Sequence, residues 1–517
     1  MLLQAKGQQR TCAPEDIRSL EREVITHRSH GDAPQPSAAH ARAYFSAEPV
    51  TECTLRIGAD GSVYVGITAA SPGPSGGFLL TRDNGRNWTH VIPTLPGEQD
   101  LVLNAAMGSI AIDPLTQRIF ASSMGDPSCP VEGEWAEKIA RLVRSRKTWS
   151  DTLAYSDDSG ASWTVVRGQF RDAGDWGKTF LGPPARAATR ERLERSGYPN
   201  VIYHCAGATF SCTSYCFRSF DGGATFERTA RPVFCDYRGR TPLPYGEPPA
   251  ELGGAPRDDQ HTLSGVGVVA NDGTIYIPAN INGFARIYVS WDEGDSWTDR
   301  PIPVAAVRGK HSYGDITGFQ QPPNGGRPIR PQQPFHALYG STAMSSLWSQ
   351  QLTIDAEGTL YLSWVSARDD LPYLSISRDG AKSWSEPLCV AAPGVNMACI
   401  SAIVVDRPGQ VAIAYYASRD GGETFDGMLS VSHDAHEPSP SWISVQTSPE
   451  APIQPNRISE PIEFVGVSFA PDGSVWAAFA RDTAIFDESS AERQCDGNFR
   501  YNGDRFKAVV LRLDANG

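Results

Sequence analysis

The residues best suited to acid–base chemistry are two glutamates and a histidine–tyrosine pair. Glu463 lies between apolar residues in the segment 460–466, where burial would desolvate its carboxylate and raise its pKa. A raised pKa suits a general acid or base, although a glutamate bonded to neighbouring backbone N–H groups fits the same pattern. Glu52 precedes the first strand-like segment, whereas His261 and Tyr313 lie in two long polar insertions. We therefore take Glu463, Glu52, His261 and Tyr313 as candidate catalytic residues.

Arginine, aromatic and carboxylate side chains gather in the same insertions and at two strand ends. Arginine forks bind carboxylates, and aromatic rings stack on the apolar faces of sugars. Ordinary loop polarity is the competing explanation for any one of these residues. The candidate substrate-binding residues are Arg238, Arg257, Asp259, His311, Trp348, Arg481 and Asp482.

An eight-residue phrase recurs along the chain and must help to position these groups. It reads Ser-Asp-Asp-Ser-Gly-Ala-Ser-Trp at residues 156–163, and related copies occupy 81–88, 219–226, 290–297 and 377–384. Its Ser or Thr and its Asp offer side-chain oxygens to backbone N–H groups, and its Gly can adopt positive φ. The phrase therefore predicts a self-capped hairpin turn, which we call the Asp turn, anchored by its final aromatic ring.

Pairs of alternating apolar strands precede the Asp turns and predict repeated four-stranded units. We count seven units, the seventh being a degenerate one that begins at residue 200. This predicts an all-β, seven-bladed β-propeller of antiparallel blades, with six blades as the alternative. Residues 49–517 are expected to form one propeller domain. Residues 1–48 are expected to form a tail that packs on the outside, with a short helix at residues 14–24.

The order of strands and turns predicts two different faces. The Asp turns join third and fourth strands on one face, whereas the insertions at 125–152, 167–199, 230–262 and 303–345 are expected on the other. Two of them, at 132–147 and 185–196, have helical spacing and are expected to wall a pocket or cover the surface.

A sixth copy of the phrase, at 418–425, follows a second strand and is expected on the insertion side. The turn at 432–442 is then the matching Asp turn, stretched by an insertion. Function is expected on the insertion side, around the mouth of the axis.

Composition limits the partners and the compartment. The 517 residues carry a net charge of -13, which disfavours nucleic acid as a partner, and no apolar run is long enough for membrane insertion. The chain has ten cysteines. Four of them cluster at positions 205, 212, 216 and 235, and two flank a short loop, at 389 and 399. These cysteines favour disulfides in an oxidising compartment. The first ten residues lack an apolar core of signal-peptide length, which leaves open whether a signal peptide was removed or never existed. Buried free thiols are the alternative, and zinc ligation is weaker because no His-x-x-x-His partner is present.

The repeated phrase resembles the Asp-box, or BNR repeat, of the sialidase superfamily, over about residues 50–515. Overall, the chain is similar to bacterial secreted proteins described as sialidase-like. The resemblance implies a substrate carboxylate held by three arginines, a Tyr/Glu nucleophile pair and an aspartic acid/base. The first of those arginines lies in an Arg-Ile-Pro motif, to which the nearest string here is Arg56-Ile57-Gly58, without the proline.

The residues and the resemblance together leave three hypotheses. The first is an extracellular, sialidase-like hydrolase of an acidic glycan, with Glu52 and Glu463 flanking the bond. The second is a polysaccharide lyase on a uronic-acid sugar, with His261 and Tyr313 as base and acid. The third is a non-catalytic propeller that binds a glycan or protein. The expected partner is a glycan or other small-molecule substrate, the expected location is secreted or periplasmic, and no cofactor is expected apart from a structural Ca2+.

Overall fold

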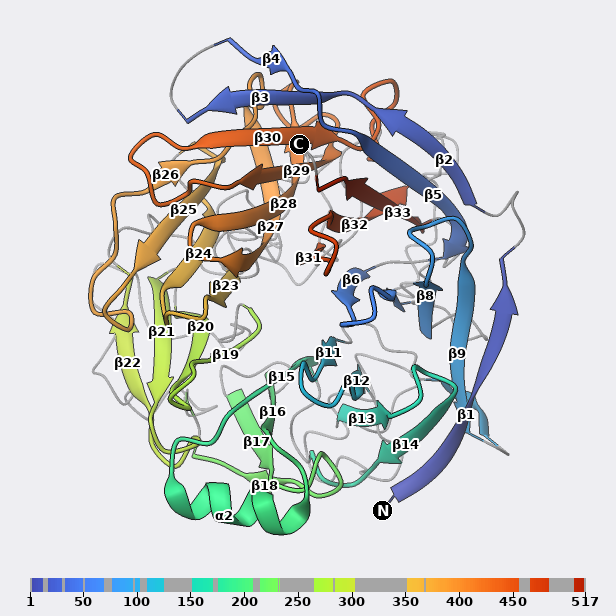
Figure 1. Cartoon of the computed structure of the whole chain (residues 1–517), viewed down its shortest axis with the longest axis vertical. Coiled ribbons are helices and arrows are strands. Elements are labelled where there is room, and N and C mark those ends of the chain that lie inside the picture. The colour runs from blue at the N-terminus through green and yellow to red at the C-terminus, as the bar shows by residue number, and fades with distance from the viewer. Residues whose placement is uncertain are drawn as a thin grey trace, which may run out of the picture.

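The computed structural model places the strands of this chain in seven radial sheets (Figure 1). It describes residues 2–12, 17–29, 33–49, 52–68, 77–95, 98–102, 109–124, 151–170, 175–207, 214–230, 232, 265–281, 284–302, 351–366, 369–454, 465–482 and 506–515.

Each blade contains four antiparallel strands, ordered from the axis outwards. Blade 1 contains β6 (Glu52–Ile57), β7 (Val63–Thr68), β8 (Gly77–Thr81) and β9 (Thr89–Leu95), with β10 (Glu98–Val102) beside β9. Blade 2 contains β11 (Ile110–Ile112), β12 (Ile119–Met124), β13 (Asp151–Ser156) and β14 (Ser162–Val166). Blade 3 contains β15 (Asp175–Gly182), β16 (Val201–Gly207), β17 (Ser214–Ser219) and β18 (Glu227–Arg228), with helix α2 (Ala187–Ser196) between β15 and β16.

The remaining blades follow the same plan. Blade 4 contains β19 (Val268–Val269), β20 (Ile275–Ile281), β21 (Phe284–Ser290) and β22 (Thr298–Pro301). Blade 5 contains β23 (Gln351–Ile354), β24 (Leu360–Val365), β25 (Pro372–Ser377) and β26 (Leu388–Cys389). Blade 6 contains β27 (Met397–Arg407), β28 (Gln410–Ser418), β29 (Asp426–Ser432) and β30 (Ser441–Gln446). Blade 7 contains β31 (Gly466–Phe469), β32 (Val475–Asp482), β33 (Phe506–Leu513) and β5 (Ala41–Pro49).

The innermost strands contact one another in a closed ring. Strand β6 packs against β11, and the series continues through β15, β19, β23, β27 and β31 back to β6. Apolar side chains from neighbouring blades fill the space between the sheets, with Trp163, Trp442 and Trp476 among the largest buried groups. The predicted seven-bladed propeller is therefore confirmed.

The first 49 residues form strands that bind the outside of several blades. Strand β1 (Leu2–Thr11) lies between β14 and β9, and β2 (Ile17–Arg22) pairs with β5. Strand β3 (Val24–Arg28) pairs with β30 and with β4 (Gln35–Pro36). Strand β5 pairs with β33, so a segment from the start of the chain completes the last blade (Figure 1).

Two expectations about the elements are wrong. The helix expected at residues 14–24 is absent from the described part of that segment, because β2 and β3 there gain backbone partners from neighbouring sheets. The seventh unit does not begin at residue 200. Strand β16 is the second strand of blade 3, and its first strand, β15, lies inside the presumed insertion 167–199.

The Asp turn forms as its chemistry predicts. Ser156 Oγ donates to the Asp158 carboxylate at 2.9 Å, and the Gly160 amide donates to Ser156 Oγ at 2.8 Å. The amide and hydroxyl of Ser162 donate to Asp158 at 2.7 and 2.6 Å, while Trp163 Nε1 donates to the Gly160 carbonyl. The same serine- or threonine-to-aspartate network forms in the other four copies.

The sixth copy of the phrase has the same local geometry but a different place in the blade. Residues 418–425 join β28 to β29, the second and third strands of blade 6, and Asp420 accepts from Ser418 and Thr424. The turn at 432–441 joins β29 to β30, where Asp434 accepts from Ser432 Oγ and from the Ser441 amide. Both register predictions for this blade are therefore confirmed.

Candidate functional site

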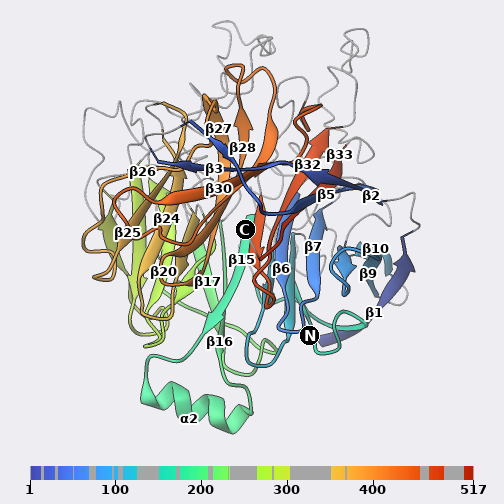
Figure 2. The same cartoon turned by 45° about the horizontal axis from the view of Figure 1, so that its top comes forward.

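The strand order defines two faces of the propeller. Connections from first to second and from third to fourth strands, including the five Asp turns, lie on one face, which we call the Asp-turn face. Connections from second to third strands and between blades begin and end on the opposite side, the insertion face. Figure 2 shows the strands running between these two sides.

The strand ends with the largest sequence gaps between them all lie on the insertion face. Residues 125–150 and 483–505 separate second from third strands, and residues 229–267, 302–350 and 447–465 separate one blade from the next. The predicted insertions at 125–152, 230–262 and 303–345 therefore start and finish on the insertion face, as expected. Nearly all connections on the Asp-turn face are short and described.

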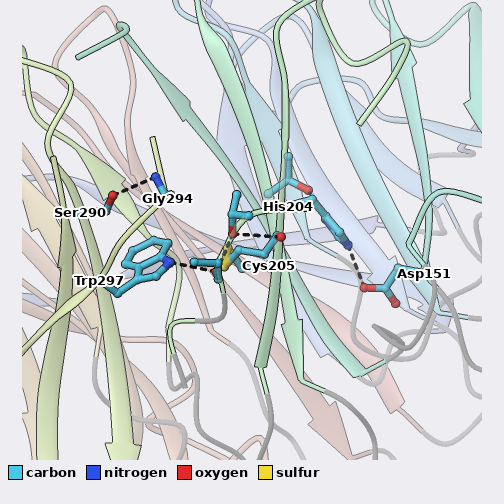
Figure 3. The surroundings of a disulfide bond; sticks show 10 residues. Asp151, His204, Cys205, Ser290, Gly294 and Trp297 are labelled. Carbon is cyan, nitrogen blue, oxygen red and sulfur yellow. Dashed lines mark hydrogen bonds and ion pairs between the residues drawn. A yellow bond between two sulfur atoms is a disulfide. The ribbon is translucent and has the colours of Figure 1, made fainter. Parts of the chain in front are cut away.

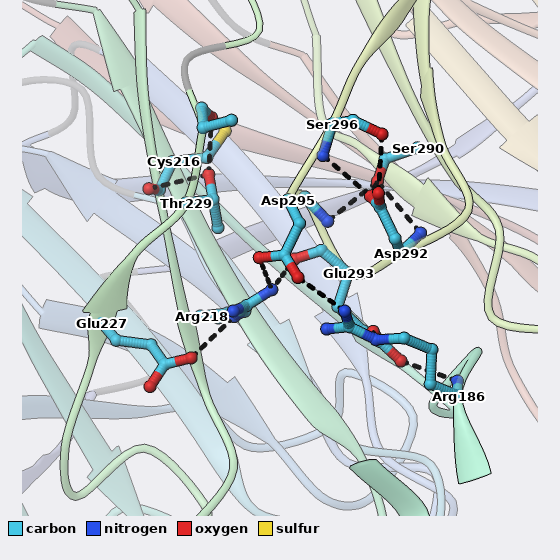
Figure 4. Close-up of polar contacts among 12 residues, drawn as sticks. Arg186, Cys216, Arg218, Glu227, Thr229, Ser290, Asp292, Glu293, Asp295 and Ser296 are labelled. Atoms are coloured by element: carbon cyan, nitrogen blue, oxygen red, sulfur yellow. Dashed lines mark hydrogen bonds and ion pairs between the residues drawn. The ribbon is translucent and has the colours of Figure 1, made fainter. Parts of the chain in front are cut away.

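Helix α2 lies on the Asp-turn face, so the expectation that it walls a pocket on the insertion face is wrong. It follows β15 and precedes β16, a first-to-second connection (Figure 2). The Glu293 carboxylate holds its start, because Glu293 Oε1 accepts from the amides of Ala185 and Arg186 at 2.9 and 2.8 Å. The Arg186 side chain also binds Glu293 and lies 2.5 Å from Asp295 (Figure 4). The helix is thus fastened to an Asp turn of blade 4.

A second arginine extends this ion-pair network between blades 3 and 4. Arg218 lies on β17 and contacts Asp295 at 2.8 Å and Glu227 at 2.9 Å, and it donates to the Glu293 carbonyl (Figure 4). Glu293 is fully buried, so its carboxylate needs the Arg186 guanidinium and the two amides that bind it. We assign this network a structural role in docking the helix.

Most candidate site residues lie outside the described part of the chain. This applies to Glu463, His261, Tyr313, Arg238, Arg257, Asp259, His311 and Trp348. Glu52 is described only as the first residue of β6, at the insertion face, and its side chain is not described. The roles of these residues remain predictions.

The two fully described candidates, Arg481 and Asp482, end strand β32 on the insertion face. The Arg481 guanidinium lies 5.5 Å from the centre of the Phe45 ring on β5, toward the outer strands of blade 7. Burial, and secondarily the nearby Arg18, lowers the pKa of Arg481. Asp482 is 7% exposed, and its amide donates to the Ile453 carbonyl. These contacts favour packing roles at the blade end, and binding of substrate by either residue remains a prediction.

Arg56, the arginine nearest to the Arg-Ile-Pro motif, lies near the other end of its strand. It is the fifth residue of β6, one position before Ile57, where the strand ends at the Asp-turn face. Its guanidinium donates to the Leu55 carbonyl at 2.7 Å, and burial lowers its pKa. Arg56 is therefore separated by most of the strand from the insertion face.

A buried chain of polar groups links blades 2 and 3 at the insertion face. Asp151 begins β13, and its Oδ2 lies 2.8 Å from His204 Nε2 on β16 (Figure 3). His204 Nδ1 lies 3.0 Å from Thr179 Oγ1 on the inner strand β15. His204 is fully buried and Asp151 is 2% exposed, so neither contacts solvent directly.

The surroundings of this Asp–His–Thr chain hold it in place. Phe170 packs on the His204 ring at 4.6 Å between centres, and Gly177 leaves room for the carboxylate, since a Cβ there would lie 2.2 Å from Asp151 Oδ2. Burial raises the pKa of the Asp151 carboxyl, and the interactions with His204 and Lys178 offset this only in part. The chain can order the ends of β13, β15 and β16 or hold a proton between buried groups.

A disulfide stabilises the strand that carries His204. Cys205 on β16 is bonded to Cys216 on β17, directly across the strand pair (Figure 3). Cys389 and Cys399 are free thiols, so the disulfide suggested by the loop between them is wrong. Cys212 and Cys235 lie outside the described residues.

The described residues contain no cluster of three His, Cys, Asp or Glu side chains that could hold a metal ion. A structural Ca2+ therefore remains a prediction for the rest of the chain. None of the described segments forms a helix with the length and apolar character needed to cross a membrane.

Comparisons with known proteins identify no family for this chain. No protein-family model matches it, and neither does any curated protein. A protein of unknown function from Dyadobacter fermentans has a TM-score of 0.40 at 11% identity, with 80% of this chain and 95% of that chain covered. The NanB sialidase of Streptococcus pneumoniae has a TM-score of 0.41 at 8% identity, with 100% and 95% covered.

A microbial sialidase, Hadza Hz136, is similar to the same degree, with a TM-score of 0.38 at 11% identity and 92% and 90% of the two chains covered. Sialidases and other sugar-active propellers are thus among the similar structures. At such low identities and TM-scores these likenesses carry no argument about activity, and the propeller assignment rests on the strand pairing.

Sequence reasoning missed the buried Asp–His–Thr chain. Asp151 fell inside a presumed insertion, and His204 was read as part of a first strand. The sequence feature that could have identified it is a polar residue among strongly apolar neighbours, as for His204 within residues 201–206. Which strand from which blade would face His204 depends on the tertiary structure.

Proposed function

We propose that this protein is a secreted or periplasmic hydrolase that cleaves a glycosidic bond in an acidic glycan at the axial mouth of its insertion face. The observation that carries the proposal is that the connections between strands differ in length on the two faces. The strand ends separated by the five longest segments share one face, and enzymes commonly build sites from such connections on a rigid scaffold.

The register between blades 7 and 1 supports a pair of carboxylates. A Cβ at Gly466 on β31 would lie 2.5 Å from the Leu55 amide nitrogen on β6, so these parallel inner strands are in close contact. Counting back three residues from Gly466 and Leu55 reaches Glu463 and Glu52 in the sequence. Both glutamates thus precede the contact by the same number of residues, and the proposal is that they flank the bond that is cleaved.

An acidic glycan fits the arginines predicted for this face. Arg238 and Arg257 occur in the segment between blades 3 and 4, and guanidinium groups bind carboxylates in two-point hydrogen bonds. The disulfide between Cys205 and Cys216 supports an oxidising compartment outside the cytoplasm. Catalysis by Glu463 and Glu52, and substrate binding by these arginines, are parts of the proposal.

The test is turnover of a sialoside panel and a uronan panel by the whole protein. We expect new reducing ends without the absorbance of an unsaturated product. Glu463→Gln should lower the rate at least about a hundredfold, because it removes a proton-transferring group. Glu191→Gln, an exposed change on helix α2 at the other face, should leave the rate unchanged.

Three outcomes would contradict the proposal. An unsaturated product would show a lyase, for which His261 and Tyr313 are the candidate base and acid. No turnover on either panel would favour a binding propeller. An unchanged rate for Glu463→Gln would remove this residue from the mechanism while leaving the activity in place.

A further inference from the structure

A polar cavity opens on the Asp-turn face, far from the proposed catalytic mouth. Its volume is about 840 Å³, within the range of small-ligand sites. Strands β2, β5 and β33 of blade 7 form one side, and the Asp turn of blade 1, residues 84–88, forms the other. The cavity therefore lies where the two ends of the chain close the ring.

The charged groups around the cavity have a small excess of cations. Three guanidinium groups, those of Arg42, Arg86 and Arg512, line it with two carboxylates, those of Glu21 and Asp514. This excess contrasts with the net charge of -13 of the whole chain. Asp472, outside the lining, also contacts Arg512, so the preference for an anion depends on the one lining guanidinium that has no carboxylate partner among the described residues.

Two of the three arginines are already held by carboxylates. Arg42 pairs with Glu21 across the β2–β5 ladder, and Arg512 lies 3.1 Å from Asp514 and 3.5 Å from Asp472. The Arg512 guanidinium also lies 5.5 Å from the centre of the Trp476 ring, which fixes its position. The carboxylates hold these two guanidinium groups in place and partly neutralise their charge.

Arg86 differs because its guanidinium forms no hydrogen bond or ion pair with any described residue. The same holds for the side chains of Asn84 and His40, which are likewise exposed and line the cavity. The cavity thus offers a cation for one carboxylate, together with amide and imidazole groups for hydroxyls.

The aromatic rings at the cavity floor are not available for stacking. Tyr44 and Trp88 are each 3% exposed, and Tyr44 stacks on Trp476 at 5.9 Å while its hydroxyl donates to the Asn84 carbonyl. A Cβ at Gly85 would collide with the Tyr44 ring, so the turn and the ring are tightly fitted. Recognition here must therefore rely on charge and hydrogen bonds.

We propose that this cavity is a second binding site for a sugar that carries a carboxylate, with Arg86 holding the carboxylate and Asn84 and His40 bonding hydroxyl groups. A bound sugar bridges blade 1 with strands β5 and β33 and so stabilises the closed ring. The site is non-catalytic and independent of hydrolysis at the insertion face, since it uses none of the proposed catalytic residues.

The test measures binding of glucuronate, glucose and acetate to the full-length protein by calorimetry and by the shift in Tm. Glucuronate should bind in the millimolar range and raise Tm, because a ligand bound only by the folded state stabilises it. Arg86→Gln should weaken glucuronate binding at least about tenfold, the loss expected for one charge-assisted hydrogen bond. Glucose and acetate should each bind more weakly than glucuronate.

Arg82→Gln is the matched control, because Arg82 is an exposed arginine on the same Asp turn that donates to the Ser159 carbonyl instead of lining the cavity. Its affinity for glucuronate should equal that of the wild type. Equal losses in both variants, equal binding of acetate and glucuronate, or no saturable glucuronate binding would each overturn the proposal. Glu463→Gln should retain the binding, which separates this site from the proposed hydrolase activity.

Discussion

At the scale of single residues, the Asp151–His204 pair shows how two titratable groups are buried between two blades. The carboxylate and imidazole come from β13 and β16, and Thr179 on β15 bonds the second ring nitrogen. Removing the partner of a buried carboxylate destabilises the fold far more than removing the partner of an exposed one. The pair therefore couples the packing of blades 2 and 3.

We predict that His204→Phe lowers the free energy of unfolding by about 3 kcal/mol at neutral pH, because it leaves Asp151 buried without its partner. Thr179→Val removes only the other hydrogen bond of the ring and should cost about 1 kcal/mol. Urea unfolding at pH 7 measures both values. The pKa of Asp151 is already raised by burial, so protonation at lower pH should reduce the His204→Phe deficit. Equal losses in the two variants would argue against a special role for the pair.

At the scale of the element, the Asp turn draws its stability from an ionised carboxylate. In the turn of blade 5, Asp379 accepts hydrogen bonds from Ser377 Oγ, from the amides of Lys382 and Ser383, and from Ser383 Oγ. Burial opposes ionisation, but these hydrogen bonds outweigh it and lower the pKa of Asp379 to about 2. The carboxylate pKa is lowered in the turns at Asp83, Asp158, Asp221 and Asp292 as well.

We predict that Asp379→Asn lowers stability at pH 5 to 7 and that the deficit disappears as the pH falls from about 3.8 to about 2. The sign follows because a carboxyl with a lowered folded-state pKa stabilises the fold only while it is ionised. Thermal unfolding as a function of pH gives the difference from the wild type. Asp406→Asn, at the exposed end of β27, serves as the control, and a deficit independent of pH for Asp379→Asn would contradict the account.

At the scale of the whole molecule, the ring closes through hydrogen bonds between its two ends. Strand β5 pairs with β33 and supplies the fourth strand of blade 7, and its Ala43 and Tyr44 are buried in the core shared with blade 1. Closure by a strand from the other end of the chain protects the edge of β33 and joins the first and last blades.

We predict that removal of residues 1–40 leaves a folded monomer of reduced stability, because β5 still closes blade 7. Removal of residues 1–49 should abolish cooperative unfolding and cause aggregation, because it exposes the β33 edge and the apolar side chains behind it. Size-exclusion chromatography and near-ultraviolet circular dichroism of the two truncated proteins measure this. Similar behaviour of both proteins would show that β5 is dispensable for closure.

The repeated phrase was sufficient to predict the turns and, with the strands that precede it, the unusual phase of residues 418–425, whereas the count of seven blades came from the pairs of alternating strands. Each of these depends on local chemistry, since Ser156, Asp158 and Gly160 satisfy one another within a few residues. Strand alternation added the antiparallel order within blades. The start of blade 3 could not be predicted, because β15 lies in a segment without the repeated pattern and is defined by its pairing with β16.

From the sequence, the candidate site could be assigned to one face of the propeller but not to a defined arrangement of residues. Sequence order alone determined that the Asp turns and the insertions at 125–152, 230–262 and 303–345 leave the strands at opposite ends, because antiparallel strands alternate direction. Tertiary structure decided that α2 docks on Glu293 at the Asp-turn face, that β5 completes the last blade, and that Asp151 meets His204. These contacts join segments distant in the chain. Their energies depend on burial and on neighbours from other blades, which no local pattern encodes.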